Sequence, residues 1–336
     1  MSFDRIPLVD LSPMFGTDRA AMLRTAEEVR EICHTIGFMY VKNHGVDQAL
    51  IGRVIDDIDQ FFAQPLEEKM KLDINKLGYH RGYVPMGGLA SKPGGKYDLQ
   101  EGYEVGNEFP ADDPAFLAGN KIHTGNVWPQ HPPAFGKDVY DYYQAVVGLG
   151  HTLFRTFALA FGLPETWFED KLERTISNLR LIYYPPQEPT ADSAYEAGIG
   201  AHTDYECFTI LYQTDHGLEV RNPRGEWVAA PPIPGTFVIN IGDMMQRWTN
   251  DYFVSTAHRV TNRTGRPRYS LPLFFCTGYD VVVRPLDRCT GPDNPPRYRP
   301  TKVGYWVEQR HAVAYVYRWP DRDSLPDPEI GPVPEV

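Results

Sequence analysis

Two histidines and one aspartate have the residue types and the spacing of a metal site. His202 and Asp204 are separated by a single residue, so on a strand their side chains would point to the same side. His258 follows much later, inside another segment with the composition of a strand. Two imidazoles and one carboxylate on one face leave open positions on an octahedral iron(II), where a bidentate cosubstrate and dioxygen can bind. These residues therefore predict a non-haem iron site.

A second polar group follows His258 and has the chemistry of a carboxylate site. Arg268 and Ser270 share one face of a predicted strand. A guanidinium binds a carboxylate through two parallel hydrogen bonds, and a neighbouring hydroxyl adds another. A small carboxylate could therefore lie with one end on this pair and the other on the metal. Because a His-x-Asp pair alone is common by chance, the interpretation depends on both groups together.

The elements that must position these groups fall into two parts. Apolar residues at helical spacing predict helices over about 19–34, 47–62 and 137–161, and short strands are expected at 6–10 and 37–41. From residue 178 the period changes to short apolar runs separated by turn residues, which is typical of an antiparallel jelly roll or barrel. The runs lie at 179–184, 208–213, 218–221, 237–241, 255–260, 269–275 and 281–284. A last helix is expected near 305–312.

The long segment 72–135 is rich in glycine and turn residues, which suggests a pocket wall or lid. We expect 78–104 to become ordered when substrate binds. The substrate pocket is expected between the loop after Tyr79, the strand around Tyr103 and the C-terminal helix. The candidate substrate residues are Arg81, Tyr83, Tyr103, Glu104 and Phe274.

Composition excludes several classes of protein. The 336 residues carry a net charge of −11, and no basic run offers a face for nucleic acid. No apolar run reaches the length needed to span a bilayer, and the N-terminus lacks the apolar region of a signal peptide. The four cysteines show no short paired spacing. We therefore expect a cytoplasmic protein that acts on a small molecule, without a nucleic-acid or membrane partner; the sequence makes no prediction of oligomeric state.

The chain resembles the iron(II)- and 2-oxoglutarate-dependent dioxygenases of the isopenicillin N synthase-like superfamily over nearly its whole length. The most specific segments are Gly200–Asp204, Asn240–Asp243, Thr256–Val260 and Arg268–Ser270. The N-terminal segments 6–11 and 37–46, the middle segment 98–104 and the Tyr184-Pro185-Pro186 turn also fit. The resemblance implies a mainly β fold, with a double-stranded β-helix (jelly roll) core framed by helices.

The resemblance also implies which residues act. His202, Asp204 and His258 match the iron ligands, Arg268 and Ser270 match the residues that hold the distal carboxylate of 2-oxoglutarate, and Tyr184 matches a tyrosine that often joins them. Many members have asparagine where this chain has Ile182, so one contact to the cosubstrate is in question. By position the chain divides into an N-terminal dioxygenase region (1–135), a framing helix (136–177), the jelly-roll core (178–285) and a C-terminal loop and helix (286–336).

The implied reaction couples oxidation of a substrate C–H bond by dioxygen to the conversion of 2-oxoglutarate into succinate and CO2. Hydroxylation is the default outcome, and desaturation or ring closure are variants. Two alternatives stay open at this point. One is a 2-oxoglutarate-independent iron oxidase of the isopenicillin N synthase type, in which Arg268 and Ser270 would hold the substrate's own carboxylate. The other is a metal-bearing binding protein without turnover. A zinc hydrolase is disfavoured, because only Glu206 stands near the His-x-Asp pair as a general base.

Overall fold

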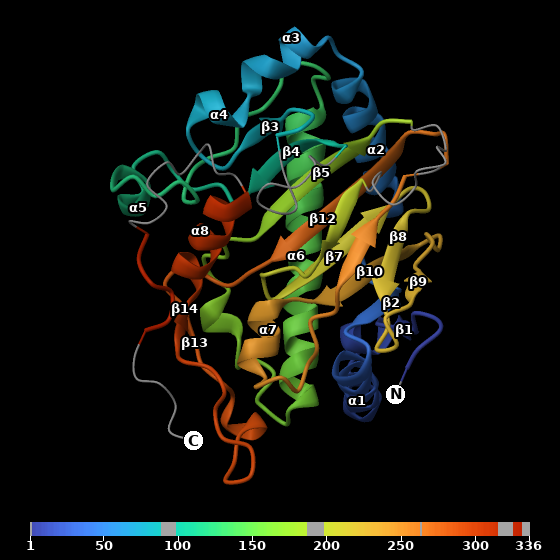
Figure 1. Cartoon of the computed structure of the whole chain (residues 1–336), viewed down its shortest axis with the longest axis vertical. Helices are drawn as coiled ribbons and strands as arrows, with labels where there is room; N and C mark the ends of the chain where they lie inside the picture. The colour runs from blue at the N-terminus through green and yellow to red at the C-terminus, as the bar shows by residue number, and fades with distance from the viewer. Residues whose placement is uncertain (1, 89–98, 187–197, 263, 315–324, 331–336) are drawn as a thin grey trace.

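The computed structural model describes residues 2–88, 99–186, 198–262, 264–314 and 325–330, and its centre is a large twisted β-sheet (Figure 1). Its strand order is β1-β2-β10-β7-β12-β5-β4-β3. All described neighbours in it pair antiparallel except β1 and β2, which are parallel. The strands are β1 (Leu8–Asp10), β2 (Phe38–Lys42), β3 (Gly82–Val84), β4 (Glu101–Gly106), β5 (Asn178–Tyr184), β7 (Phe208–Gln213), β10 (Thr236–Ile241) and β12 (Arg268–Phe275).

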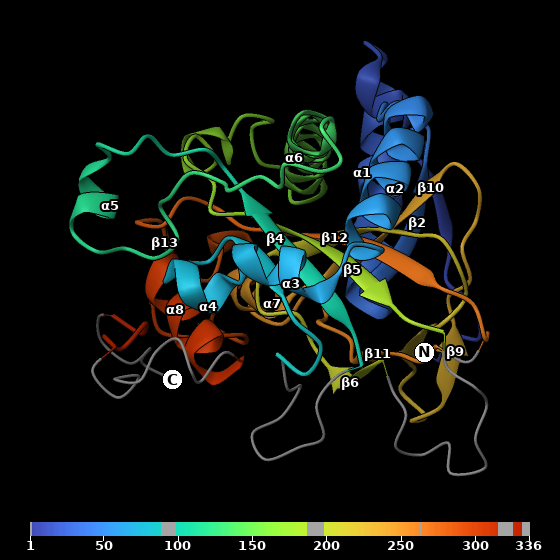
Figure 2. The same cartoon turned by 90° about the horizontal axis from the view of Figure 1, so that it is seen from above.

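A smaller sheet, β6-β11-β8-β9, lies on one side of the large sheet (Figure 2). Its strands are β6 (Ile199–His202), β8 (Leu218–Arg221), β9 (Trp227–Ala229) and β11 (His258–Val260), and a separate ribbon joins β13 (Val282–Val283) to β14 (Thr301–Lys302). Two antiparallel sheets facing each other form the expected jelly roll, so the predicted fold class is confirmed.

The three long helices α1 (Arg19–Thr35), α2 (Gln48–Phe62) and α6 (Phe135–Ala160) cover the opposite face of the large sheet (Figure 2). The last helix, α8 (Val303–Ala314), lies on the same side as the small sheet. Short helices complete the described fold: α3 (Leu66–Lys69), α4 (Ile74–Leu77), α5 (Pro114–Leu117) and α7 (Asp243–Trp248). No described helix has both the length and the apolar character needed to cross a bilayer.

The large sheet separates two hydrophobic cores. Alternate residues of a strand face opposite sides, so Leu179 and Leu181 of β5 pack toward the helices, whereas Ile182 and Tyr184 pack toward the small sheet. The helix-side core is the larger of the two and joins residues of α1, α2 and α6 to the strand residues that face them. This core covers one face of the large sheet. The opposite face is therefore available to carry the residues of a site.

Close packing of α6 on β12 depends on Gly150, which faces the ring of Phe275. A Cβ at position 150 would overlap that ring, whereas Gly148, on the exposed side of the same helix, has open space around it. We expect Gly150→Ala to lower the free energy of unfolding by about 1–3 kcal/mol through overpacking. Gly148→Ala should leave it unchanged or raise it by about 0.5–1 kcal/mol, because alanine favours the helix. Urea unfolding of both variants tests this, and a Gly150→Ala protein as stable as wild type would contradict it.

The predicted helices and most predicted strands are confirmed to within a few residues. The strand expected around Tyr103 is confirmed as β4; residues 82–84 of the same turn-rich segment form a further strand, β3, which was not expected, and both strands extend the large sheet. Within the proposed lid 78–104, residues 89–98 lie outside the described part of the chain.

Candidate active site

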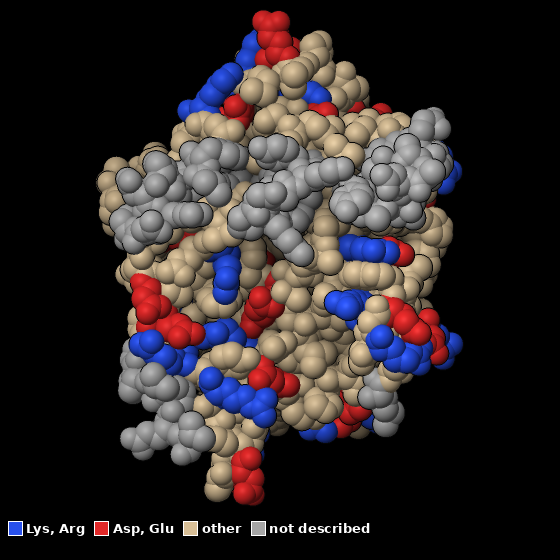
Figure 3. Space-filling view, viewed as in Figure 1, with Lys and Arg blue, Asp and Glu red and all other residues tan. Residues whose placement is uncertain are grey.

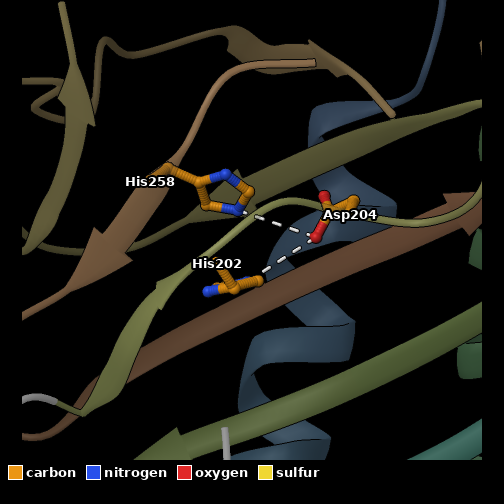
Figure 4. A group of neighbouring side chains, drawn as sticks. All are labelled: His202, Asp204 and His258. Carbon is orange, nitrogen blue, oxygen red and sulfur yellow. Dashed lines mark ion pairs between the residues drawn. The ribbon is translucent and has the colours of Figure 1, made fainter. Parts of the chain in front are cut away.

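His202, Asp204 and His258 meet between the two sheets (Figure 4). His202 ends β6, and His258 begins β11 directly opposite it in the strand pairing, which brings the two imidazole centroids to 4.3 Å. One ligand atom from each of the three residues lies within 4.8 Å of the others. Asp204 stands just beyond β6 rather than on it, which differs from the strand expected to carry both residues.

Hydrogen bonds orient each of the three side chains. Nδ1 of His202 lies 2.7 Å from the Gly200 carbonyl oxygen, and Nδ1 of His258 lies 3.2 Å from that of Thr256. A carbonyl only accepts, so each Nδ1 carries a proton and Nε2 is the ring nitrogen left to face Asp204. Both Nε2 atoms lie 3.6 Å from Oδ1 of Asp204. This arrangement is the one in which histidine binds a metal.

The Asp204 carboxylate is buried and held by two neutral donors. Its Oδ2 accepts a hydrogen bond from the Thr209 hydroxyl and one of 2.7 Å from the Asn240 amide. Burial alone would raise the pKa of Asp204, but His258, His202 and these two hydrogen bonds outweigh it and hold the pKa below its ordinary value. The carboxylate is therefore ionised, as a metal ligand must be.

The segment that carries Asp204 is fixed by the turn between β10 and α7. The backbone N–H groups of Asp243 and Met244 donate to the carbonyls of Asp204 and Glu206 at 2.8 and 3.1 Å. Gly242 allows this approach, because a Cβ there would overlap the Glu206 carbonyl. These hydrogen bonds to the Asp204 and Glu206 carbonyls hold the segment in place of strand pairing.

A cavity of about 270 Å³ adjoins the three residues. Its wall includes Asp204, both histidines and the hydroxyls of Ser270 and Tyr184, and much of the remainder is apolar. The apolar part of the wall includes Ile182, Ile199, Leu211, Leu218, Val260 and Phe274. The side-chain oxygen of Gln100, also on the wall, is buried without a hydrogen-bond partner in the described part of the protein. The cavity therefore combines a cluster of oriented polar side chains with a largely apolar wall.

Arg268 is fully buried beside the Tyr184 end of this cavity, with its guanidinium carbon 4.8 Å from the tyrosine ring centre. Its Nε donates to the Asp215 carbonyl at 3.2 Å and its Nη2 to the Gln213 side chain at 2.9 Å. Its Nη1 is buried and makes no hydrogen bond of ordinary geometry with a described residue. Burial lowers the pKa of Arg268, and Tyr184 and Asp215 offset part of that lowering. A buried guanidinium whose Nη1 N–H groups are unused calls for an anion.

Ile182 lies on the cavity wall directly opposite Ser270 in the strand pairing. At this position the chain offers a hydrocarbon surface rather than an amide. The groups at this end that could bind a carboxylate are Arg268, Ser270 and Tyr184, all carried by the paired strands β12 and β5.

Of the candidate substrate residues, Phe274 lies on the cavity wall, and the other four lie outside its described lining. Tyr83 donates to the Glu101 carboxylate and Tyr103 to the Val127 carbonyl, each at 2.6 Å. Arg81 is buried against the His80 and Ile122 carbonyls. Glu104 lies behind the wall, where it accepts a hydrogen bond of 2.7 Å from Nε of Arg180.

Sequence reasoning did not single out Arg180 and Arg310, which line the cavity, or the roles of Thr209 and Asn240. Arg180 could have been found, because it precedes Ile182 and Tyr184 at strand spacing and so shares their face. Arg310 carries no such signal: only the packing of α8 against the site brings it to the cavity. On the face in Figure 3, acidic and basic side chains occur in small mixed groups.

Comparisons with known proteins agree with this geometry. Residues 6–131 match a family model described as the non-haem dioxygenase in morphine synthesis N-terminal, and residues 175–277 match the 2OG-Fe(II) oxygenase superfamily. A 2-oxoglutarate-Fe(II) type oxidoreductase of Emericella nidulans, hxnY, is 36% identical over 314 residues, covering 92% of this chain and 90% of the relative. A homoarginine-6-hydroxylase of Oryza sativa is 35% identical over 306 residues, covering 85% and 90%.

The fold has solved counterparts as well. A full-length Neurospora crassa protein, crystallised in complex with alpha-KG and thymine, superposes with a TM-score of 0.81 at 27% identity, covering 91% of this chain and 96% of that one. The matches extend over the N-terminal region as well as the jelly roll, and they agree with the donor set at the cavity. The chain belongs to the 2-oxoglutarate- and iron(II)-dependent oxygenase superfamily.

Proposed function

We propose that this oxygenase oxidises a C–H bond of a small metabolite, with hydroxylation as the outcome, and that His202, Asp204 and His258 hold its iron. One observation carries the proposal: three oriented ligand atoms lie within 4.8 Å of one another on the wall of a cavity that Tyr184 also lines, and the guanidinium of buried Arg268 lies 4.8 Å from the ring of that tyrosine. The donor set fits iron(II), because two imidazoles and one carboxylate leave positions open for other ligands. When bound, the iron supplies the activation of dioxygen.

The chain's own groups would orient 2-oxoglutarate. Arg268 offers Nη1 to the distal carboxylate, and the Ser270 and Tyr184 hydroxyls lie on the same stretch of wall. Ser270 and Pro272 line the cavity, and Arg268 precedes them at the strand period of two, so it shares their face of β12. Ile182 adds an apolar contact in place of a hydrogen bond.

The apolar wall has the second task of excluding water. Leu211, Leu218 and Val260 surround the polar groups and keep the local dielectric constant low, which strengthens every charge interaction in the cavity. A closed site also keeps a reactive oxidant away from bulk solvent.

The substrate is expected to be small. The cavity volume of about 270 Å³ lies just below the usual range of ligand pockets, roughly 300 to 1,000 Å³, and the same space must hold the cosubstrate. One similar protein is named for homoarginine, another was crystallised with thymine, and both molecules are compact metabolites.

A screen of small metabolites for substrate-stimulated succinate formation tests this function. The iron(II)-loaded chain should form succinate from 2-oxoglutarate in air, a true substrate should raise the rate, and the oxidised product should contain oxygen from labelled dioxygen. The Asp204→Ala variant, which lacks the carboxylate ligand, should form succinate only at the background rate. Equal succinate formation by Asp204→Ala and wild type would refute the assignment.

A further inference from the structure

The described cavity wall has few charged residues, and they differ in whether a carboxylate of the protein pairs with them. Outside the three proposed metal ligands, the described lining contains two charged side chains, Arg180 of β5 and Arg310 of α8. Both side chains are positively charged, so the net charge of the wall depends on whether each is paired with a carboxylate of the protein.

Arg180 has its counter-ion within the protein. Glu104 lies opposite it in the pairing of β4 and β5 and accepts its Nε hydrogen bond at 2.7 Å. The Asn178 amide donates to the other Glu104 oxygen at 2.6 Å, and the Glu104 side chain is fully buried. The pair is therefore fixed and contributes no net charge to the cavity.

Arg310 is an exposed residue, and no described residue gives it such a counter-ion. Its guanidinium lies 4.0 Å from the ring centre of Trp306, whose indole N–H is bonded to the Tyr205 carbonyl at 2.8 Å. Among the described residues no carboxylate lies within salt-bridge distance of it; the charge of Asp243 acts on it from further away, and that carboxylate is bonded to Ser255. Arg247, the other cation on Trp306, pairs with Glu329 at 2.6 Å.

The charges of the loaded site isolate Arg310 further. Iron(II) and Arg268 carry three positive charges, which equal the three negative charges of Asp204 and dianionic 2-oxoglutarate. Arg180 and Glu104 also cancel. Arg310 is then the guanidinium of the described lining that has no described carboxylate within salt-bridge distance; it is exposed, and Asp243 acts on it only from further away.

We propose that the primary substrate is a small monocarboxylate whose carboxylate pairs with Arg310. The planar fork of the guanidinium suits two parallel hydrogen bonds to a carboxylate. Val313 and Ala314 of α8, together with Phe274 of β12, provide apolar surface for the rest of the molecule. This inference rests on the proposed function and adds the class of substrate to it.

The test is binding without turnover. The iron(II) enzyme is first titrated with 2-oxoglutarate under nitrogen, and the resulting complex is titrated calorimetrically with small aromatic and alicyclic monocarboxylic acids, each paired with its primary amide. The amide keeps the size and shape of the acid and removes the charge. The acids that bind should be preferred over their amides by on the order of twofold to fivefold, as expected for a partly exposed ion pair.

Two variants assign that preference to one residue. Arg310→Gln should abolish the preference for acids and leave 2-oxoglutarate binding unchanged. Arg288→Gln removes an equal charge from an exposed position outside the cavity and should keep the preference. Amides that bind as tightly as acids, a preference that survives in Arg310→Gln, or no acid bound at millimolar concentration would each overturn the inference. Failure of 2-oxoglutarate itself to bind would instead contradict the proposed function.

Discussion

Replacing His258 by alanine is expected to abolish turnover and to reduce iron(II) affinity by more than a hundredfold. Loss of an outer partner of a metal ligand already costs roughly ten- to a hundredfold in affinity or activity, and His258 is proposed as a ligand itself. The side chain is buried beside Phe38, with ring centres 5.3 Å apart, so some stability will be lost as well. Iron content after desalting, succinate formation and the thermal unfolding midpoint should be measured on one preparation.

A matched variant separates the metal from general damage. His216 is an exposed histidine in the turn between β7 and β8, outside the cavity lining. His216→Ala should retain full iron content and turnover. Should His258→Ala keep wild-type iron content and activity, the assignment of the three ligands is wrong.

Replacing Arg268 by alanine is expected to raise the apparent constant for 2-oxoglutarate by roughly ten- to a hundredfold. A hydrogen bond to a charged group contributes about 1.5–3 kcal/mol, and each 1.4 kcal/mol corresponds to about tenfold in affinity. The effect on the primary substrate should be smaller, because Arg268 lies at the end of the cavity that we assign to the cosubstrate. Steady-state titration of 2-oxoglutarate at saturating iron measures this change.

Two further arginine variants show whether the geometry of Arg268 matters. Arg268→Lys should recover only part of the affinity, because an ammonium keeps the charge but cannot reproduce the planar fork. Arg266 lies two residues away on the surface, paired with Asp215 at 3.0 Å, and Arg266→Ala should leave the constant within about twofold. An Arg268→Ala enzyme that binds 2-oxoglutarate normally but loses affinity for the primary substrate would favour the 2-oxoglutarate-independent oxidase.

Local patterns were sufficient to predict much of the architecture. The apolar repeat over 19–34 predicted α1, and the short runs after residue 178 predicted β5, β7, β8, β10 and β12. These patterns work because burial on one face imposes a period of 3.6 on a helix and 2 on a strand. Arg268 and Ser270 were also predictable as a pair, since one strand of known period carries both.

Other features depend on contacts between distant segments. β3 and β4 have weak patterns of their own and exist because they pair beside β5. Asp204 lies beyond its strand, because the turn at Gly242 holds that segment through backbone hydrogen bonds. Tyr83 and Tyr103 have the side chains of pocket residues, yet the register of β3 and β4 directs them to the helix-side core. Sequence alone gives residue types, whereas the face that a residue occupies depends on strand register and helix packing.

The ratio of CO2 to oxidised product tests directly whether substrate oxidation is coupled to the decarboxylation of 2-oxoglutarate. Once a substrate has been found, CO2 released from 1-labelled 2-oxoglutarate and oxidised product are counted in the same vessel, with and without 2-oxoglutarate. At saturating substrate we expect one CO2 for each molecule of oxidised product. We expect no oxidised product when 2-oxoglutarate is omitted, and neither CO2 nor product from the His258→Ala variant. Product that forms at an undiminished rate when 2-oxoglutarate is omitted would contradict this coupling.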